Sequence, residues 1–196
     1  MKKSIPFLLC LVIALIIAFT NMDTSQSNPM TTYPNLPAPI GKEKILITSA
    51  GQAMEGAIVY SISESLHLDA DYRPRALDSD LYDYQSVIII LGYSANGLAY
   101  TNRSFQEELS LTKALLTEAI LQELPIIVVD LSSRGRDSKH TRELFELVTP
   151  YTAYYIGLKN EQGYHPYKQD LPKLDIPVTL LNELDDLATP LNSAFR

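Results

Sequence analysis

Cysteine is almost absent from this chain of 196 residues: Cys10 is the single one, and it lies in the apolar run near the N-terminus. The chain beyond that run therefore has no disulfide and no cysteine nucleophile. Disulfides are not needed for stability, because a domain of about 155 residues can bury enough surface to form a single hydrophobic core.

Positive charge is also scarce, since 16 Lys and Arg face 23 Asp and Glu and give a net charge of −7. Two of the lysines, Lys2 and Lys3, precede the N-terminal apolar run, so the rest of the chain is more acidic still. An acidic surface argues against nucleic acid and against anionic membrane surfaces as partners.

The N-terminal residues 1–20 have the pattern of a targeting segment. The lysine pair is followed by the unbroken apolar run Ile5–Phe19, whose length of about 15 residues suits a secretory signal and is short for a membrane span. Ala18 and Thr20 fit a cleavage site only loosely, so a cleaved signal peptide and an uncleaved N-terminal membrane anchor both stay open. Either one predicts an extracytoplasmic protein, secreted or anchored to the cell membrane.

Residues 21–40 are rich in Ser, Thr, Asn and Pro and lack apolar periodicity. This composition is typical of a flexible linker. A single Rossmann-like α/β domain is predicted to follow over residues 41–196.

Strand-like and helix-like patterns alternate along this domain. The stretches 86–92 and 125–131 are apolar over 87–91 and 125–129, which is typical of central parallel strands covered on both faces. Residues 71–77 form a weaker pattern, in which Pro74 suits an edge strand. The predicted strands are 44–49, 71–77, 86–92, 125–131, 152–158 and 176–181. The alternation predicts a single doubly wound parallel sheet of five to six strands with helices on both faces, in a flavodoxin-like or Rossmann-like order.

Apolar residues recur at helical spacing between these strands. A cap at Asp137 or Ser138 is expected to open the third helix. Near the C-terminus, Thr189-Pro190 predicts an N-cap and first turn, and therefore two short helices in place of one kinked helix. The faces expected to pack on the sheet are Met54, Ala57, Ile58, Ile62 and Leu66 in the first helix, Phe105, Leu109, Thr112, Leu116 and Ile120 in the second, and Thr141, Leu144, Phe145 and Val148 in the third.

In parallel α/β sheets, ligands bind outside the carboxyl ends of the strands, near the point where the strand order reverses. Three polar, glycine-containing stretches are predicted there, at 47–58, 91–100 and 130–138. Helix N-termini behind such loops favour an anion. The ligand-binding residues predicted from these stretches are Ser49, Gly51, Gln52, Gly92, Ser94, Asn96, Gly97, Asp130, Ser132, Arg134 and Arg136.

The stretch 47–58 raises the question of a nucleotide site, because Gly51 and Gly56 stand at the spacing of a phosphate-binding loop. The next two positions are Ala57 and Ile58, where a P-loop has Lys and then Ser or Thr, so the loop has neither a cation for the phosphates nor a magnesium ligand. A dinucleotide fingerprint fails as well, because no glycine stands two residues after Gly51. Few hydroxyl groups follow Gly51, which speaks against a flavin phosphate. No cofactor is therefore predicted.

The other candidates each have two interpretations. Arg134 and Arg136 stand on either side of a glycine, a pattern that suits a clamp for a carboxylate or phosphate, or a solvated loop. Residues 94–97 suit a ligand contact or a simple turn. Tyr93 and Tyr100 suit a sandwich around a flat ligand, or ordinary packing.

Groups that could perform catalysis are few. Asp130 ends a buried strand, where an acid is costly unless it is used chemically or caps its own following turn. His67, His140 and His165 include no pair at ligand spacing, so no metal site is predicted. No nucleophile elbow of the form G-x-S-x-G occurs.

The order of these motifs resembles an uncharacterised bacterial family of exported proteins, a domain of unknown function with a Rossmann-like core. Residues 48–52 match its TSAGQ motif after the first strand, and residues 176–195 match its closing strand and proline-containing helix. The stretch 91–100 is poorer in glycine than the family pattern, and Asp130 stands where the family usually has a histidine. The resemblance runs from about residue 43 to residue 196 and implies the fold and export, with no established activity.

We expect a non-catalytic module that binds a small polar or anionic ligand at the carboxyl ends of the strands. Two alternatives stay open. One is an enzyme, a hydrolase or a transferase, with Asp130 or His140 as its base. The other is an interaction subunit of a membrane transporter, in which case a membrane protein is the partner. The oligomeric state is not predicted.

Overall fold

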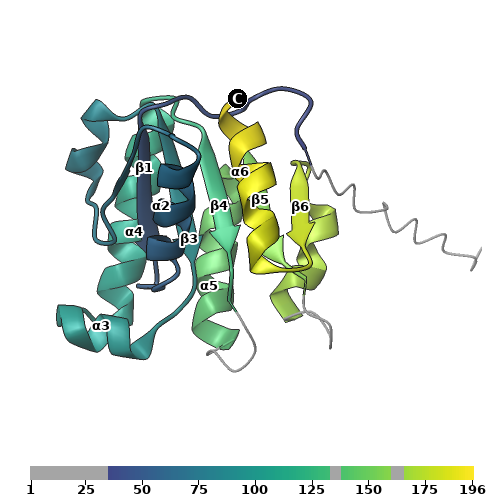
Figure 1. Cartoon of the computed structure of the whole chain (residues 1–196). Helices are drawn as coiled ribbons and strands as arrows, with labels where there is room; N and C mark the ends of the chain where they lie inside the picture. Colours follow the sequence, from purple (N-terminus) through teal and green to yellow (C-terminus); the bar gives the residue numbers. More distant parts are fainter. Residues whose placement is uncertain (1–34, 133–137, 160–165) are drawn as a thin grey trace, which may run out of the picture.

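The computed structural model describes residues 35–132, 138–159 and 166–196, which build an α/β fold around a single six-stranded parallel sheet (Figure 1). The strand order is β2-β1-β3-β4-β5-β6, which is flavodoxin-like. The predicted fold class is therefore confirmed. The strands are β1 (Ile45–Ala50), β2 (Ala70–Tyr72), β3 (Ser86–Leu91), β4 (Ile126–Asp130), β5 (Tyr154–Leu158) and β6 (Val178–Leu181).

Helices cover both faces of the sheet (Figure 1). One face is covered by α2 (Gly56–Ser65) and α6 (Ala188–Phe195). The opposite face is covered by α4 (Phe105–Leu121) and α5 (Ser138–Val148). A short helix, α3 (Ala95–Thr101), follows β3. The described 3₁₀ segments are η1 (Asp78–Asp83), η2 (Thr149–Tyr151), η3 (Pro166–Lys173) and η4 (Leu184–Leu187).

The hydrophobic core lies on both sides of the central strands β1 and β3. Ile45, Ile47 and Ile88 pack toward α2 and α6. Leu46 and Ile89 pack toward α4 and α5, and none of these five side chains is more than 1% exposed. Successive residues of a strand point to opposite faces, so a strand buried on both faces needs an apolar residue at nearly every position. This is why the apolar run 86–92 identified a central strand.

The buried face of the first helix differs from the prediction. Met54 is 71% exposed and Ile58 is 39% exposed, whereas Val59 is fully buried. The helix begins only at Gly56, so Met54 precedes it, and the side that meets the sheet is rotated from the predicted one. The ring of Tyr72 lies against Gly56, where an added Cβ would be 2.4 Å from its Cε2 atom. Position 56 therefore needs a glycine so that the Tyr72 ring can pack against the backbone, which explains this glycine without a phosphate site.

Three predicted element boundaries also change. The strand predicted at 71–77 ends at Tyr72, so Pro74 lies in the following turn. The stretch 91–100, predicted as a loop, contains α3, and the Ser94 hydroxyl caps it by accepting the Gly97 N–H at 3.1 Å. Two short helices do end the chain, but α6 starts directly after η4, so Thr189-Pro190 lies within its first turn.

The described chain enters the fold at the amino edge of the sheet, beside the C-terminus (Figure 1). Leu36 N–H donates to the Ser193 hydroxyl at 3.3 Å, and Gly41 N–H donates to the carbonyl oxygen of Ala194 at 2.8 Å. Within the part of the chain that the structure describes, no helix is both long and apolar enough to cross a bilayer. The predicted targeting segment 1–20 lies outside the described residues, as does most of the predicted linker.

Tyr84, just before β3, contacts the edge strand β2 and the turn that follows it. Its hydroxyl donates to Asp71 Oδ2 at 2.8 Å, and its ring lies 5.2 Å from Lys44 Nζ and 5.7 Å from Arg73 Cζ. Burial, followed by the hydrogen bond to Asp71, raises the pKa of Tyr84 to about 12.

A pKa raised by folding means that Tyr84 stabilises the fold while it is protonated. This contribution is fully present below about pH 10, the pKa of an unperturbed tyrosine, and is lost as the pH rises toward about 12. We expect the free energy of unfolding of wild type to fall faster than that of Tyr84→Phe between these pH values. Urea titrations at several pH values measure it, and parallel curves for the two proteins would contradict it.

Candidate functional site

The strand order reverses between β1 and β3, and the loops that follow these two strands lie against each other. Gly92 N–H donates to the carbonyl oxygen of Ala50 at 3.1 Å, and Ser94 N–H donates to that of Gly51 at 2.8 Å. An added Cβ on Gly97 would lie 2.8 Å from Gln52 Cβ. Two of the three predicted ligand loops are thus brought together, and protein atoms fill the space between them.

The turn from β1 into α2 needs left-handed backbone at two residues. Gly51 has a φ of 90° and Gln52 a φ of 60°. A Cβ on residue 51 would lie 2.6 Å from the carbonyl oxygen of Gly92, so glycine alone fits there. Gln52 is only 8% exposed, and its side chain points into the protein.

The turn binds a carboxylate of the chain itself. Glu108, in the first turn of α4, is 2% exposed. Its Oε1 atom accepts the N–H of Gly51 at 3.1 Å and Nε2 of Gln52 at 3.0 Å. Its Oε2 atom lies 3.2 Å from the same Nε2 and 3.4 Å from Nη1 of Arg103. The turn after β1 therefore binds an internal carboxylate, and the small anionic ligand expected at these loops stays a prediction.

Glu108 was not among the predicted site residues, because these were drawn only from the loops at the carboxyl ends of the strands. The buried positions of α4 are Glu108, Thr112, Leu115, Leu116 and Ala119. Glu108 stands one helical turn before Thr112, on the same face. An acidic residue on the same helix face as the buried positions was the sequence signal that could have identified Glu108.

Other predicted ligand residues also have structural partners. The Ser49 hydroxyl donates to the carbonyl oxygen of Ala53 at 3.0 Å. The Tyr72 hydroxyl lies near Ser49; burial raises the pKa of Tyr72, and its hydrogen bond with Ser49 opposes this rise. Asn96 lies exposed on α3.

Asp130 is fully buried at the end of β4. Its Oδ1 atom accepts hydrogen bonds from the Ser132 N–H, at 3.0 Å, and from the Ser132 hydroxyl. Its Oδ2 atom accepts one from the Tyr155 hydroxyl at 2.7 Å. Asp130 thus caps its own following turn, which was one of its two interpretations. Arg134 and Arg136 lie outside the described residues.

His140 belongs to an aromatic cluster at the same edge of the sheet. Its ring centre lies 4.5 Å from that of Tyr93 and 4.2 Å from that of Phe105. Tyr100, by contrast, is 87% exposed. Outside the undescribed segments, which include His165, no group of His, Cys, Asp and Glu residues could hold a metal ion.

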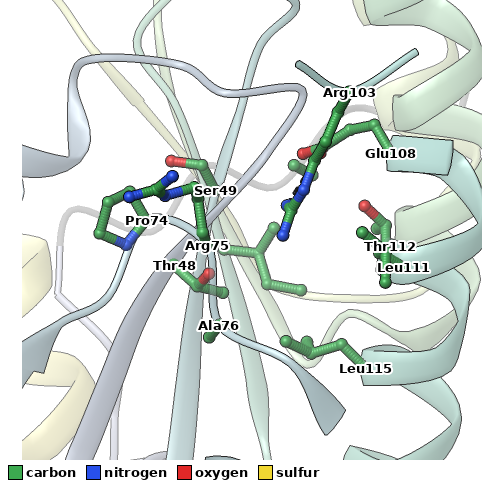
Figure 2. Close-up of a pocket in the computed structure, with 12 residues that line it drawn as sticks. Thr48, Ser49, Pro74, Arg75, Ala76, Arg103, Glu108, Leu111, Thr112 and Leu115 are labelled. Carbon is green, nitrogen blue, oxygen red and sulfur yellow. Dashed lines mark hydrogen bonds and ion pairs between the residues drawn. The ribbon is translucent and has the colours of Figure 1, made fainter. Parts of the chain in front are cut away.

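A small cavity with polar and apolar lining lies beside Glu108, between the sheet and α4 (Figure 2). Its volume is about 10 Å³, which is room for about one water molecule. Thr48 and Thr112 line it, at 3% and 8% exposure, and their hydroxyls have no hydrogen-bond partner among the described residues. The lining is completed by Ser49, Ala50, Pro74, Arg75, Ala76, Ile89, Arg103, Glu108, Leu111 and Leu115.

Two arginines border this cavity. Figure 2 shows it between the turn after β2, which carries Arg75, and the loop before α4, which carries Arg103. The side chain of Arg103 is 21% exposed and runs beside Glu108. Arg75 is exposed and makes no ion pair or hydrogen bond with any described residue. Neither arginine was among the predicted site residues, because Arg75 falls in the strand predicted at 71–77 and Arg103 lies after the predicted loop 91–100.

Comparison with known proteins agrees with the resemblance at the level of the family. No curated protein shows a significant match to the chain. A family model described as a domain of unknown function (DUF6305) matches residues 42–195, which includes every described strand and helix of the fold. The chain therefore belongs to the DUF6305 family.

Proposed function

We propose that this is an exported or membrane-anchored protein that binds a small anionic molecule without catalysis, in the cavity beside Glu108. The observation that carries the proposal is the pair of buried, unpartnered hydroxyls of Thr48 and Thr112 between two arginines. A buried polar group without a partner costs about 1–3 kcal/mol. An oxygen atom of a water or a ligand in the cavity would offer a hydrogen-bond partner to these hydroxyls.

Charge favours an anion over a neutral ligand. Arg75 has no described counter-charge, and guanidinium groups bind carboxylates and phosphates with paired hydrogen bonds. The cavity admits only the tip of a ligand, so the rest of the molecule would lie on the rim formed by Pro74 and Arg75. Affinity is therefore expected to be modest.

The structure bears on both alternatives. The carboxylate oxygens of Asp130 are buried and accept hydrogen bonds, which makes it a poor base for a substrate and leaves His140 as the candidate of the enzyme hypothesis. The chain enters the fold at the amino edge, opposite the cavity. Because the predicted linker 21–40 is flexible, this position does not fix how the cavity faces a membrane, and the transporter subunit stays the second candidate function.

Thermal unfolding of the purified full chain tests the proposal with acetate, glycolate, phosphate, amino acids and nucleotides. We expect at least one anion to raise the midpoint in a concentration-dependent way, because a ligand of the native state stabilises it. Arg75→Ala should weaken this binding about tenfold or more, since it removes a charge-assisted hydrogen bond.

Arg73→Ala is the matched control, because Arg73 already pairs with Asp80 at 3.2 Å and does not line the cavity. It should leave the ligand-induced shift unchanged. Equal loss in both variants would mean that only net charge matters, and no shift of wild type with any anion would refute the proposal.

A further inference from the structure

The cavity is surrounded by charges that do not cancel. Arg103 faces the Glu108 carboxylate at 3.4 Å, and Gly51 and Gln52 also donate to that carboxylate. Arg75 is the cation left over among the described residues that line the cavity. A ligand with one negative charge would balance Arg75. A ligand with two would place its second charge close to the buried Glu108 carboxylate, where the repulsion is poorly screened.

The size of the cavity also favours a small anion with a single charge. With about 10 Å³ available, one oxygen atom fits in the cavity that Thr48 and Thr112 help to line. A planar carboxylate can insert one oxygen there and direct the other toward a guanidinium at the rim. A tetrahedral phosphate that inserts one oxygen has three more to hydrogen-bond, and the walls at Ala76, Ile89 and Leu115 offer side chains without hydrogen-bonding groups.

We infer that the ligand is a small monocarboxylate, and that Glu108 makes the site select it against phosphate and other dianions. This inference rests on the proposed function and adds the ligand class and the residue that sets it. Glu108 acts in two ways: its carboxylate holds the turn after β1 in place, and its charge repels a dianion at the adjoining cavity.

Isothermal titration of the full chain with acetate, glycolate and inorganic phosphate tests the inference, at about pH 8, where phosphate is mainly a dianion. The best carboxylate should bind at least about tenfold more tightly than phosphate. Glu108→Gln should reduce this ratio about tenfold, because it removes the repelling charge and keeps an amide oxygen for Gly51. Glu107→Gln is the control: it removes the charge of an exposed neighbour, and a glutamine retains the capping box with Ser104.

The outcomes separate the two proposals. Tighter binding of phosphate than of any carboxylate by wild type overturns the ligand class and leaves the anion site. An unchanged ratio in Glu108→Gln overturns the role of Glu108. No binding of any anion overturns both. If Glu108→Gln does not fold, wild type still decides, because phosphate should bind more tightly as a monoanion at about pH 5.5 than as a dianion at about pH 8.

Discussion

Replacing Glu108 with alanine is expected to lower the free energy of unfolding by about 3 kcal/mol or more. The substitution leaves the N–H of Gly51 and the amide of Gln52 without their carboxylate, and each buried donor left unpaired costs about 1–3 kcal/mol. Urea unfolding measures the change. Glu118→Ala, which removes a carboxylate farther along the same helix and away from the cavity, should cost much less.

The space left by Glu108→Ala should accept a free carboxylate. Formate or acetate is expected to raise the thermal midpoint of this variant more than that of wild type, because the added anion restores the partner of Gly51 and Gln52. Chloride at the same ionic strength should not. Glu108→Met fills the space with an apolar side chain, so it should stay destabilised without being rescued. Rescue of both variants, or of neither, would contradict the conclusion that the Glu108 carboxylate holds the turn after β1 in place.

The second large effect is expected where β4 meets β5. Asp130→Ala should destabilise the fold by about 3 kcal/mol, because Ser132 and Tyr155 then lose the acceptor of their hydrogen bonds. Tyr155→Phe removes one donor and should cost less. The double variant should cost less than the sum of the two, with a coupling of about 1–2 kcal/mol.

A double-mutant cycle by urea unfolding measures this coupling. Tyr151→Phe is the matched control, because Tyr151 is 46% exposed and its change should stay within about 0.5 kcal/mol. A coupling near zero would mean that Asp130 does not act through Tyr155. It would return Asp130 to the enzyme hypothesis, in which Asp130→Asn abolishes a turnover and preserves the fold.

The local pattern of apolar residues was enough to identify the strands, the helices that cover the sheet and the class of the fold. It did not identify the short helix α3. The run 86–92 is apolar at every position from Val87 to Leu91, and β3 is buried on both faces. Alternation of such runs with helical spacing is compatible with few arrangements other than a parallel sheet covered on both sides. The pattern was weaker where it depended on a boundary: a helix that begins at Gly56 turns Met54 and Ile58 outward.

The composition of the loops predicts a small anionic ligand near the turn after β1, and this stays a prediction. What the sequence could not identify was the internal carboxylate of Glu108 that this turn binds. Glu108 lies 57 residues after Gly51, and its carboxylate reaches the turn only because α4 packs on the face of the sheet beside β1. Periodicity reports whether a side chain is buried, and does not report which distant group it meets.

The sequence by itself determined the alternation of strands and helices, the covered central strands and the acidic character of the chain. Only the tertiary structure decided that Thr48, Thr112, Arg75 and Arg103 border one cavity, and that the loops after β1 and β3 hydrogen-bond to each other. The reason is physical. Secondary structure follows from interactions between near neighbours in the chain, whereas a site depends on the order of strands and the rotation of helices, which are set by packing between distant segments.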